Sequence, residues 1–383
     1  MPHFQKSLGL QTKKQYFDRK MNVDPKSRHI DESSLRSLYD PEPVNEGDLW
    51  FLPAAPEDVA PTDMPWPIAA RETSLEPKVW QAAEKEQYRG LVAAMQANTK
   101  FAERLRQMPD QVAERFAIDT ASAVLRSEGI WISSEQIALY RTLRISSDDS
   151  AQDLGRAAWA VRRLSGSGAT PQLGLHGFLG RVAVDRPQQV PGEERAIGAE
   201  LAALSDRWIY DLEAMHGAHP LTQAAFAFAC WRAEGITPYE ELLEPTIAAL
   251  LVGAGDLAPF LPMAQGHRLD RHSLRAGSAG AEERLAVFYT AAEAGALSAA
   301  LELDRLALWR DRARAKTGDL SGRTPPKMIE ALLRASVVSA EWLAQEVGCS
   351  PVSVRRNLRV FADRGLVREV TGQERYRFWT VAV

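Results

Sequence analysis

The chain has little cysteine and little histidine. Its 383 residues include only two cysteines, Cys230 and Cys349, and seven histidines. Two cysteines cannot build a disulfide framework, and scattered histidines do not complete a four-ligand zinc site. We therefore expect no metal, no cofactor and a reducing, cytoplasmic location.

Long hydrophobic runs and a large charge of one sign are also missing. The least charged stretches, 214–231 and 245–255, are interrupted or fall short of the roughly 20 apolar residues that cross a bilayer. No basic-then-apolar signal opens the chain. The 46 Lys and Arg against 50 Asp and Glu exclude a protein that coats nucleic acid along its whole length. We expect a globular protein with no membrane partner, in which any nucleic-acid surface is local.

Helical periodicity covers most of the chain. Apolar residues recur at helical intervals from 88 to 108, and further helices are predicted at 112–127, 134–143, 150–165, 194–215, 221–234 and 239–253. Residues 280–316 predict at least one more helix pair. We predict a mainly α protein in four parts: a polar N-terminal tail and irregular segment (1–70), a helical domain (71–316), a linker (317–326) and a small α+β domain (327–383).

The last part has the order helix, helix, short turn, helix, hairpin. Helices are predicted over 327–335, over 340–347 with Ser339 as N-cap, and from Pro351 to about Arg364 with Ser350 as N-cap. Two β-rich runs, 366–370 and 375–381, predict a hairpin. This is the order of a winged helix-turn-helix. Residues 325–383 also carry nine Lys and Arg against six Asp and Glu.

The third helix of this domain predicts contacts with double-stranded DNA. Val354, Leu358 and Phe361 fall on one stripe, so the opposite face is free to enter a major groove. We expect Ser353 and Arg356 to reach base edges, and the neighbouring arginines to contact phosphates or, on the wing, the minor groove. The candidate DNA-binding residues are Ser350, Ser353, Arg355, Arg356, Arg359, Arg375 and Arg377. The alternative is a winged helix that only docks proteins.

The central segment, 221–251, carries a helix, then Ile236, Pro238, Tyr239 and Glu241, and then an apolar helix. This pattern resembles the Fic family, in which a helix leads into the sequence IHPFxDGNGR and on to a second helix. The resemblance implies a Fic-like helical domain. The alternative is a chance likeness between two core helices joined by a turn.

The resemblance also implies that the catalytic loop is degenerate. Thr237 stands where the family has its catalytic histidine, and residues 242–245 replace the phosphate-binding GNGR. Thr237 cannot titrate near neutral pH, leucine side chains hinder the approach of a phosphate, and Pro245 offers no N–H. Glutamates in the loop would also repel an anion. The degenerate loop comprises Thr237, Glu241, Leu242, Leu243, Glu244 and Pro245.

Two further likenesses extend the comparison. Glu128 and Gly129 are similar to the end of the SSxIEG element of many Fic proteins, with Val124 where a Ser or Thr is expected. A helical region followed by a winged helix is similar to a group of uncharacterised, mostly plasmid-associated proteobacterial proteins.

From these patterns we expect a DNA-binding pseudoenzyme that regulates transcription or plasmid maintenance. The helical domain would supply a homodimer interface or the site of a small-molecule effector whose identity is unknown. Two alternatives stay open at this point: an enzyme with residual nucleotide-transfer activity that uses the winged helix to dock a protein, and a non-enzymatic protein-binding adaptor.

Overall fold

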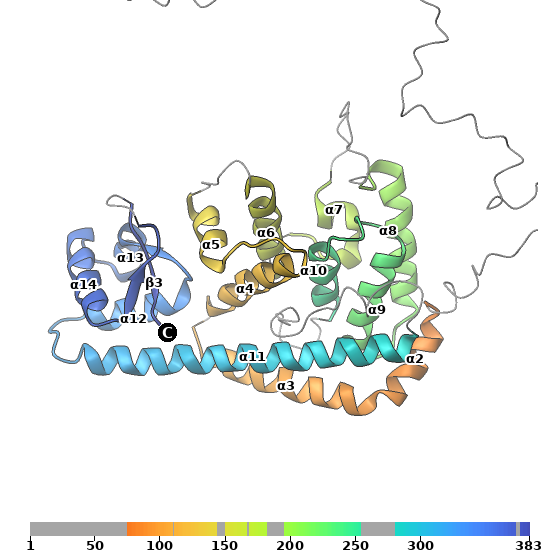
Figure 1. The fold of residues 1–383 in the computed structure, drawn as a ribbon, viewed down its shortest axis with the longest axis horizontal. Coiled ribbons are helices and arrows are strands. Elements are labelled where there is room, and N and C mark those ends of the chain that lie inside the picture. Colours follow the sequence, from red (N-terminus) through yellow and green to blue (C-terminus); the bar gives the residue numbers. More distant parts are fainter. Residues whose placement is uncertain are drawn as a thin grey trace, which may run out of the picture. The chain divides into compact units, whose positions relative to one another are not determined.

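A computed structural model describes residues 75–109, 111–143, 150–166, 168–181, 195–253, 280–372 and 376–383. All of these described residues belong to one compact unit. The described residues are mainly helical and end in a small sheet, which confirms the predicted fold class (Figure 1). The predicted N-terminal tail, 1–70, and Arg375 lie outside the described residues.

The elements before residue 320 are α2 (Pro77–Glu86), α3 (Tyr88–Arg106), α4 (Val112–Ser127), α5 (Ser134–Leu143), α6 (Ala151–Leu164), the 3-10 turn η4 (Pro171–Leu173), α7 (Leu175–Leu179), α8 (Gly198–Glu213), α9 (Pro220–Ala233), α10 (Leu243–Val252) and α11 (Ala281–Lys316). The bounds of α4 and α5 are those predicted from periodicity, and the other predicted blocks are shifted by a few residues.

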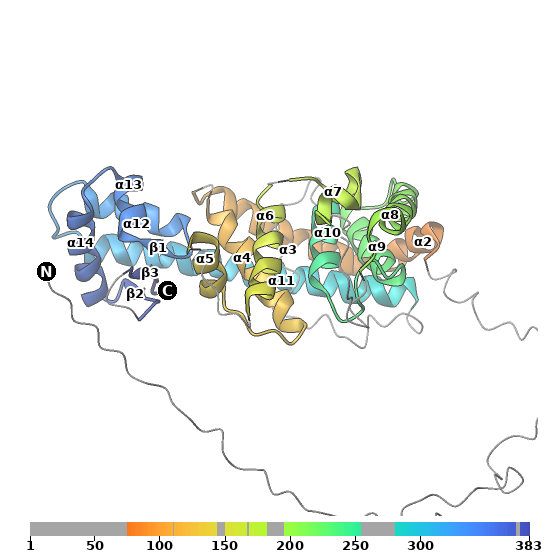
Figure 2. The same cartoon turned by 90° about the horizontal axis from the view of Figure 1, so that it is seen from above.

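The prediction of a helix pair over 280–316 is wrong. This stretch is one continuous helix of 36 residues, α11. Gly295 lies in its middle, but a single glycine costs a helix only about 1 kcal/mol, and the Ala- and Leu-rich flanks are strong helix formers. Its buried face extends from Ala281 to Ala313. The helix lies beside α3 over much of its length (Figures 1 and 2).

The core of the helical region is centred on α9 and α10, which pack against each other. Both helices are apolar on nearly all sides, as expected for helices surrounded by others. Trp231 on α9 makes an edge-to-face contact with Trp208 on α8, with ring centroids 5.7 Å apart. The Trp208 indole N–H donates to the carbonyl of Ala227 at 3.0 Å, so its polar atom is satisfied inside the core.

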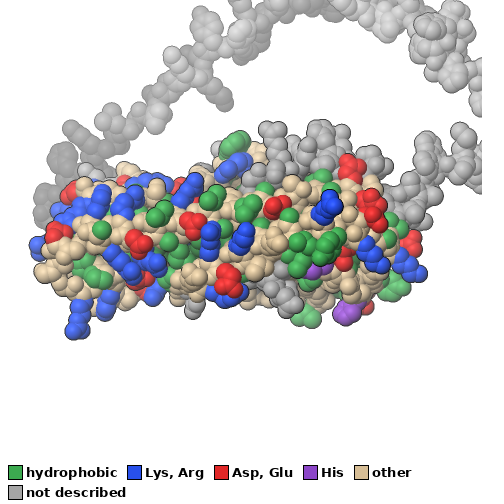
Figure 3. Space-filling view, turned by 90° about the horizontal axis from the view of Figure 1, so that it is seen from below, with side chains coloured by type: hydrophobic (Ala, Val, Ile, Leu, Met, Phe, Trp, Pro, Cys, Tyr) green, Lys and Arg blue, Asp and Glu red, His purple; other side chains and the backbone are tan. Residues whose placement is uncertain are grey.

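One face of the molecule is electrostatically mixed. On the face seen from below, acidic and basic side chains are interspersed with apolar ones (Figure 3). The most exposed apolar side chains of α11 are Leu301 and Leu308.

The C-terminal domain has the predicted element order. It consists of α12 (Thr324–Arg334), β1 (Val338–Ser339), α13 (Ala340–Val347), α14 (Pro351–Asp363), β2 (Val367–Glu369) and β3 (Phe378–Val381), with an antiparallel sheet in the order β1-β3-β2. α12 begins three residues earlier than predicted. β1 was not expected, because a strand of two residues gives no periodic signal.

Both predicted helix caps of this domain are confirmed. The Ser339 hydroxyl accepts from the backbone N–H of Trp342 at 3.1 Å, and the Ser350 hydroxyl accepts from that of Ser353 at 3.2 Å. Between them the turn uses Gly348 at φ 72°, a left-handed conformation that suits glycine. These caps fix the direction in which α14 leaves the turn.

The winged helix is hydrogen-bonded to the helical region. The Arg115 guanidinium, on α4, donates to the last carbonyls of α12: to Leu332 at 2.7 Å, to Leu333 at 2.8 Å and to Ala335. A cation here satisfies carbonyls that a helix end leaves free. Burial lowers the pKa of Arg115 to about 10, although nearby acidic residues oppose the shift. On α11, the Trp309 indole N–H donates to the carbonyl of Leu366 at 2.7 Å.

Candidate functional site

The groups of the loop over 237–245, where the sequence resembles the Fic motif, are bonded within the protein. The Thr237 hydroxyl is buried and accepts from the Trp231 indole N–H at 3.1 Å. α10 begins at Leu243, so residues 243–245 form its first turn. Pro245 lies in that turn, where its missing N–H leaves no hydrogen bond unmade.

A carboxylate occupies the N-terminus of α10. Glu128, at the end of α4, has a nearly fully buried side chain, and its Oε1 lies 2.7 Å from the backbone nitrogens of both Leu242 and Leu243. Its Oε2 accepts from the Arg156 guanidinium at 2.7 Å. The two amides that a phosphate would use are therefore already bonded to a protein carboxylate.

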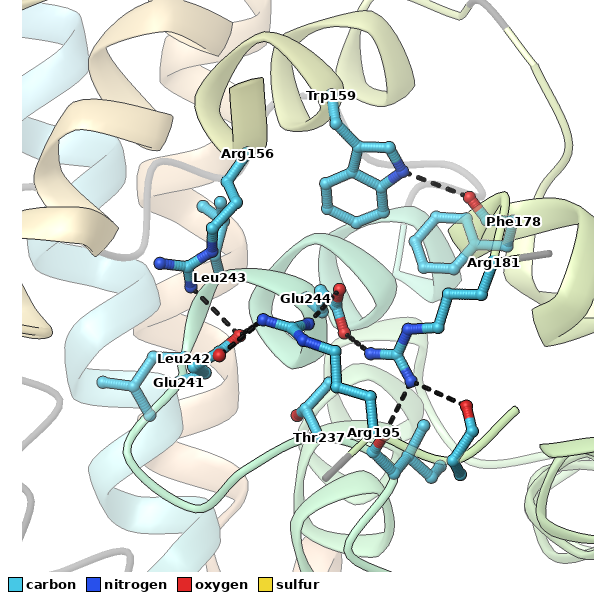
Figure 4. Close-up of polar contacts among 12 residues, drawn as sticks. Arg156, Trp159, Phe178, Arg181, Arg195, Thr237, Glu241, Leu242, Leu243 and Glu244 are labelled. Atoms are coloured by element: carbon cyan, nitrogen blue, oxygen red, sulfur yellow. Dashed lines mark hydrogen bonds and ion pairs between the residues drawn. The ribbon is translucent and has the colours of Figure 1, made fainter. Parts of the chain in front are cut away.

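Three arginines from outside the loop surround its glutamates (Figure 4). Arg195 contacts both oxygens of Glu241, at 2.5 and 2.6 Å, and one oxygen of Glu244 at 3.0 Å. Arg181 donates to Glu244 at 2.5 Å, and Arg156 reaches Glu241 at 3.2 Å. Arg195 thus bridges the two glutamates through its two terminal nitrogens, and charge-assisted hydrogen bonds of this kind are stronger than neutral ones.

The loop glutamates therefore carry no uncompensated negative charge that would repel an anion, contrary to the expectation from the sequence. Their charge is compensated by Arg156, Arg181 and Arg195, which come from segments far away in the chain. Burial works against the charge of Arg156, yet Glu128 and Glu241 outweigh it and hold the pKa of Arg156 above its ordinary value. An anion cannot bind to the backbone N–H groups of Leu242 and Leu243, because Glu128 already accepts from both. No spacing motif in the sequence predicts these contacts.

No metal site accompanies the loop. Within the described residues, no group of three His, Cys, Asp or Glu side chains is arranged to hold a metal ion. His219, which lies near Glu213 and His216 in the sequence, caps α9: its Nδ1 accepts from the backbone N–H of Leu221 at 3.1 Å.

The second candidate site is the exposed face of α14. Val354, Leu358 and Phe361 are fully buried, as the stripe predicted, and Arg355, Arg356 and Arg359 are exposed. Ser353 is half-buried, and its backbone N–H donates to the Ser350 hydroxyl. Among the described residues, neither Arg356 nor Arg359 has an ion-pair partner.

Arg355 differs from its neighbours because it is paired. Its guanidinium contacts Glu341 on α13 at 2.5 Å, and both side chains are more than half exposed. The hydrogen bond from Arg355 holds the pKa of Glu341 below its ordinary value. An exposed pair of this kind is worth little, so Arg355 can exchange Glu341 for a phosphate.

A groove of about 440 Å³ separates α14 from the wing, lined by Ala340, Glu341, Arg355, Leu358, Arg359, Tyr376, Arg377 and Trp379. Arg377 is exposed, and Tyr376 is 79% exposed with a positive φ of 59°. A left-handed backbone conformation is uncommon at a tyrosine, and it changes the direction of the chain at this residue of the wing. Arg377 therefore lines one groove together with Arg355 and Arg359 of α14.

Comparison with known proteins supports the assignment of this domain. Residues 325–382 match a family described as an HTH DNA binding domain. The C-terminal part of the chain is therefore a helix-turn-helix domain with a wing, similar to the domains of that DNA-binding family. No curated protein sequence matches the chain.

Among solved structures, the chain is similar to a Fic family protein from Desulfovibrio desulfuricans G20, whose crystal structure was determined at 2.70 Å resolution. The identity is 15%, the likeness covers 76% of this chain and 95% of that chain, and the TM-score is 0.40. The family is the one that the central sequence resembles.

No described helix combines the length and the apolar character needed to cross a membrane.

Proposed function

We propose that the chain is a regulatory protein that binds duplex DNA through α14, with a helical region that no longer transfers nucleotides. The observation that supports DNA binding most directly is the division of α14 into two faces. Val354, Leu358 and Phe361 are buried in the domain, while Arg356 and Arg359 face outward without a described ion-pair partner.

The proposed contacts follow from the geometry of a major groove. An inserted helix presents its outward side chains to base edges, where an arginine can make two hydrogen bonds to one guanine. We assign that role to Arg356. Arg355 and Arg359 lie toward the flanks of the helix and would contact phosphates, while Arg377 approaches the backbone or the minor groove from the wing.

The loss of nucleotide transfer is supported by the occupied loop. Glu128 takes the amides of Leu242 and Leu243, and Thr237 offers no general base. The helical region would then serve as a scaffold that holds the winged helix and supplies a dimer interface or an effector site. Transcription or plasmid maintenance is the process in which we place this activity.

Selection of bound genomic fragments by the purified full chain tests this function, followed by gel retardation of the enriched duplex at low salt. The proposal expects retardation that is lost when Arg355, Arg356 and Arg359 are all replaced by alanine. A control chain with Arg305→Ala, an exposed arginine of α11, should bind normally. Failure of the wild-type chain to retard any duplex would contradict DNA binding and favour a protein-docking role.

A further inference from the structure

The outward face of α14 carries an apolar side chain among its arginines. The exposed residues of this helix are Pro351, Val352, Arg355, Arg356, Arg359 and Asp363. Pro351 begins the helix, a position at which its missing N–H leaves no hydrogen bond unmade. Val352 follows it and is 72% exposed. Because the burial of apolar surface is favourable, a partner that covers Val352 gains binding free energy from it.

Val352 lies on the same stripe of α14 as Arg356. Val352, Arg356 and Arg359 follow one another at intervals of four and three residues, and side chains at these intervals share one face of a helix. This stripe lies opposite the buried stripe that contains Leu358. The face that presents Arg356 to a partner therefore also presents Val352, one helical turn nearer to the start of the helix.

The N-terminal half of α14 is the half that suits entry into a DNA groove. In helix-turn-helix proteins the first residues of the recognition helix contact the base edges. The partial positive charge of a helix N-terminus favours the approach of phosphates, whereas Asp363, exposed in the last turn of α14, would repel them. The Ser350 hydroxyl, which accepts from the backbone N–H of Ser353 at 3.2 Å, holds this first turn in place. Val352 therefore lies at the end of the exposed face that approaches the bases.

We propose that Val352 contacts the C5-methyl group of a thymine in the major groove, close to the guanine that we assign to Arg356. The inference rests on the proposed binding of duplex DNA by α14. Thymine presents a methyl group in this groove, and apolar side chains are its usual protein contact. Four residues of helix rise about 6 Å, and base pairs stack about 3.4 Å apart. The thymine should therefore lie within about two base pairs of the guanine.

Replacement of thymine by deoxyuridine in the preferred duplex tests the contact, because it removes the methyl group and leaves base pairing intact. Fluorescence anisotropy gives the affinity of the full chain for both duplexes. We expect about fourfold weaker binding to the deoxyuridine duplex, the effect of one methyl group that loses its apolar contact. Thymines replaced one at a time then locate the sensitive position. Equal affinity for the thymine and deoxyuridine duplexes overturns the proposal.

Variants assign the effect to Val352. Val352→Ala should bind the thymine and deoxyuridine duplexes alike, because the shortened side chain no longer reaches the methyl group. Leu308→Ala, which truncates a 69% exposed leucine of α11, should retain the wild-type difference between the two duplexes. A difference that persists unchanged in Val352→Ala overturns the proposal, since another residue then contacts the methyl group. If wild type binds neither duplex, the proposed DNA binding itself fails, and this inference fails with it.

Discussion

The Glu128 carboxylate lies 2.7 Å from the backbone nitrogen of Leu242, so a side chain from the end of α4 caps the start of α10. The same carboxylate binds Arg156, which in turn reaches Glu241. The helix terminus that would attract a phosphate thus has its negative charge supplied from within the chain.

Replacing Glu128 by glutamine should destabilise the helical region. The amide is isosteric but uncharged, and it leaves the buried Arg156 without its closest charge partner. Breaking a buried pair from one side typically costs about 3–5 kcal/mol, and we expect the lower end because Glu241 and Asp153 remain beside Arg156. Urea unfolding measures the loss. Glu103→Gln, which breaks the exposed pair with Arg106, should cost less than about 1 kcal/mol, and equal losses would contradict the account.

The chain should not transfer AMP from ATP to itself or to proteins of a lysate. Thr237 cannot act as a base, and the amides of Leu242 and Leu243 are occupied. Thr237→His alone should not restore transfer, because Glu128 would still occupy the start of α10. Incorporation of labelled AMP is the measurement, with heat-killed protein as the control. Label above that control in the wild-type chain would refute the loss of activity.

Stability should depend on the protonation of His219. Burial lowers the pKa of His219 below its ordinary value of 6.5, although Glu84 opposes the shift. The neutral ring accepts from Leu221 at Nδ1, and a proton there removes the cap of α9. The stabilisation is therefore complete above pH 6.5 and is lost as the pH falls through the lowered pKa.

The matched variant for this prediction is His219→Asn, a good N-cap that does not titrate. Unfolding free energies are measured for both proteins from neutral to mildly acidic pH. The difference in unfolding free energy between wild type and His219→Asn should change over this pH range. A constant difference would mean that His219 does not contribute to the pH dependence.

The sequence predicted the winged helix well and the loop poorly, for physical reasons. Caps such as Ser339 and Ser350 and the stripe of α14 are local signals, encoded within one helical turn. By contrast, Arg181 and Arg195 reach the loop glutamates from residues 63 and 46 positions away. Contacts of that kind depend on tertiary packing, which periodicity does not encode. The continuous α11 was not predicted, because 36 residues greatly exceed the usual length of a helix in a globular protein.

Arg377 should contribute to DNA affinity without contributing to sequence preference. If its partner is a phosphate, Arg377→Ala weakens binding to all duplexes alike and reduces the slope of log affinity against log salt by about one counterion. Fluorescence anisotropy with a preferred and a scrambled duplex over a salt series gives both quantities. A loss confined to the preferred duplex would instead make Arg377 a base contact.

The most direct test of the account is the affinity of Arg356→Ala for the preferred duplex and for its scrambled counterpart, relative to wild type. Arg356 lies on the exposed face of α14, opposite the buried Leu358. We predict a loss of about 1–3 kcal/mol on the preferred duplex, a smaller loss on the scrambled one, and therefore a relaxed sequence preference. Unchanged affinity and discrimination in Arg356→Ala would contradict the claim that α14 reads DNA.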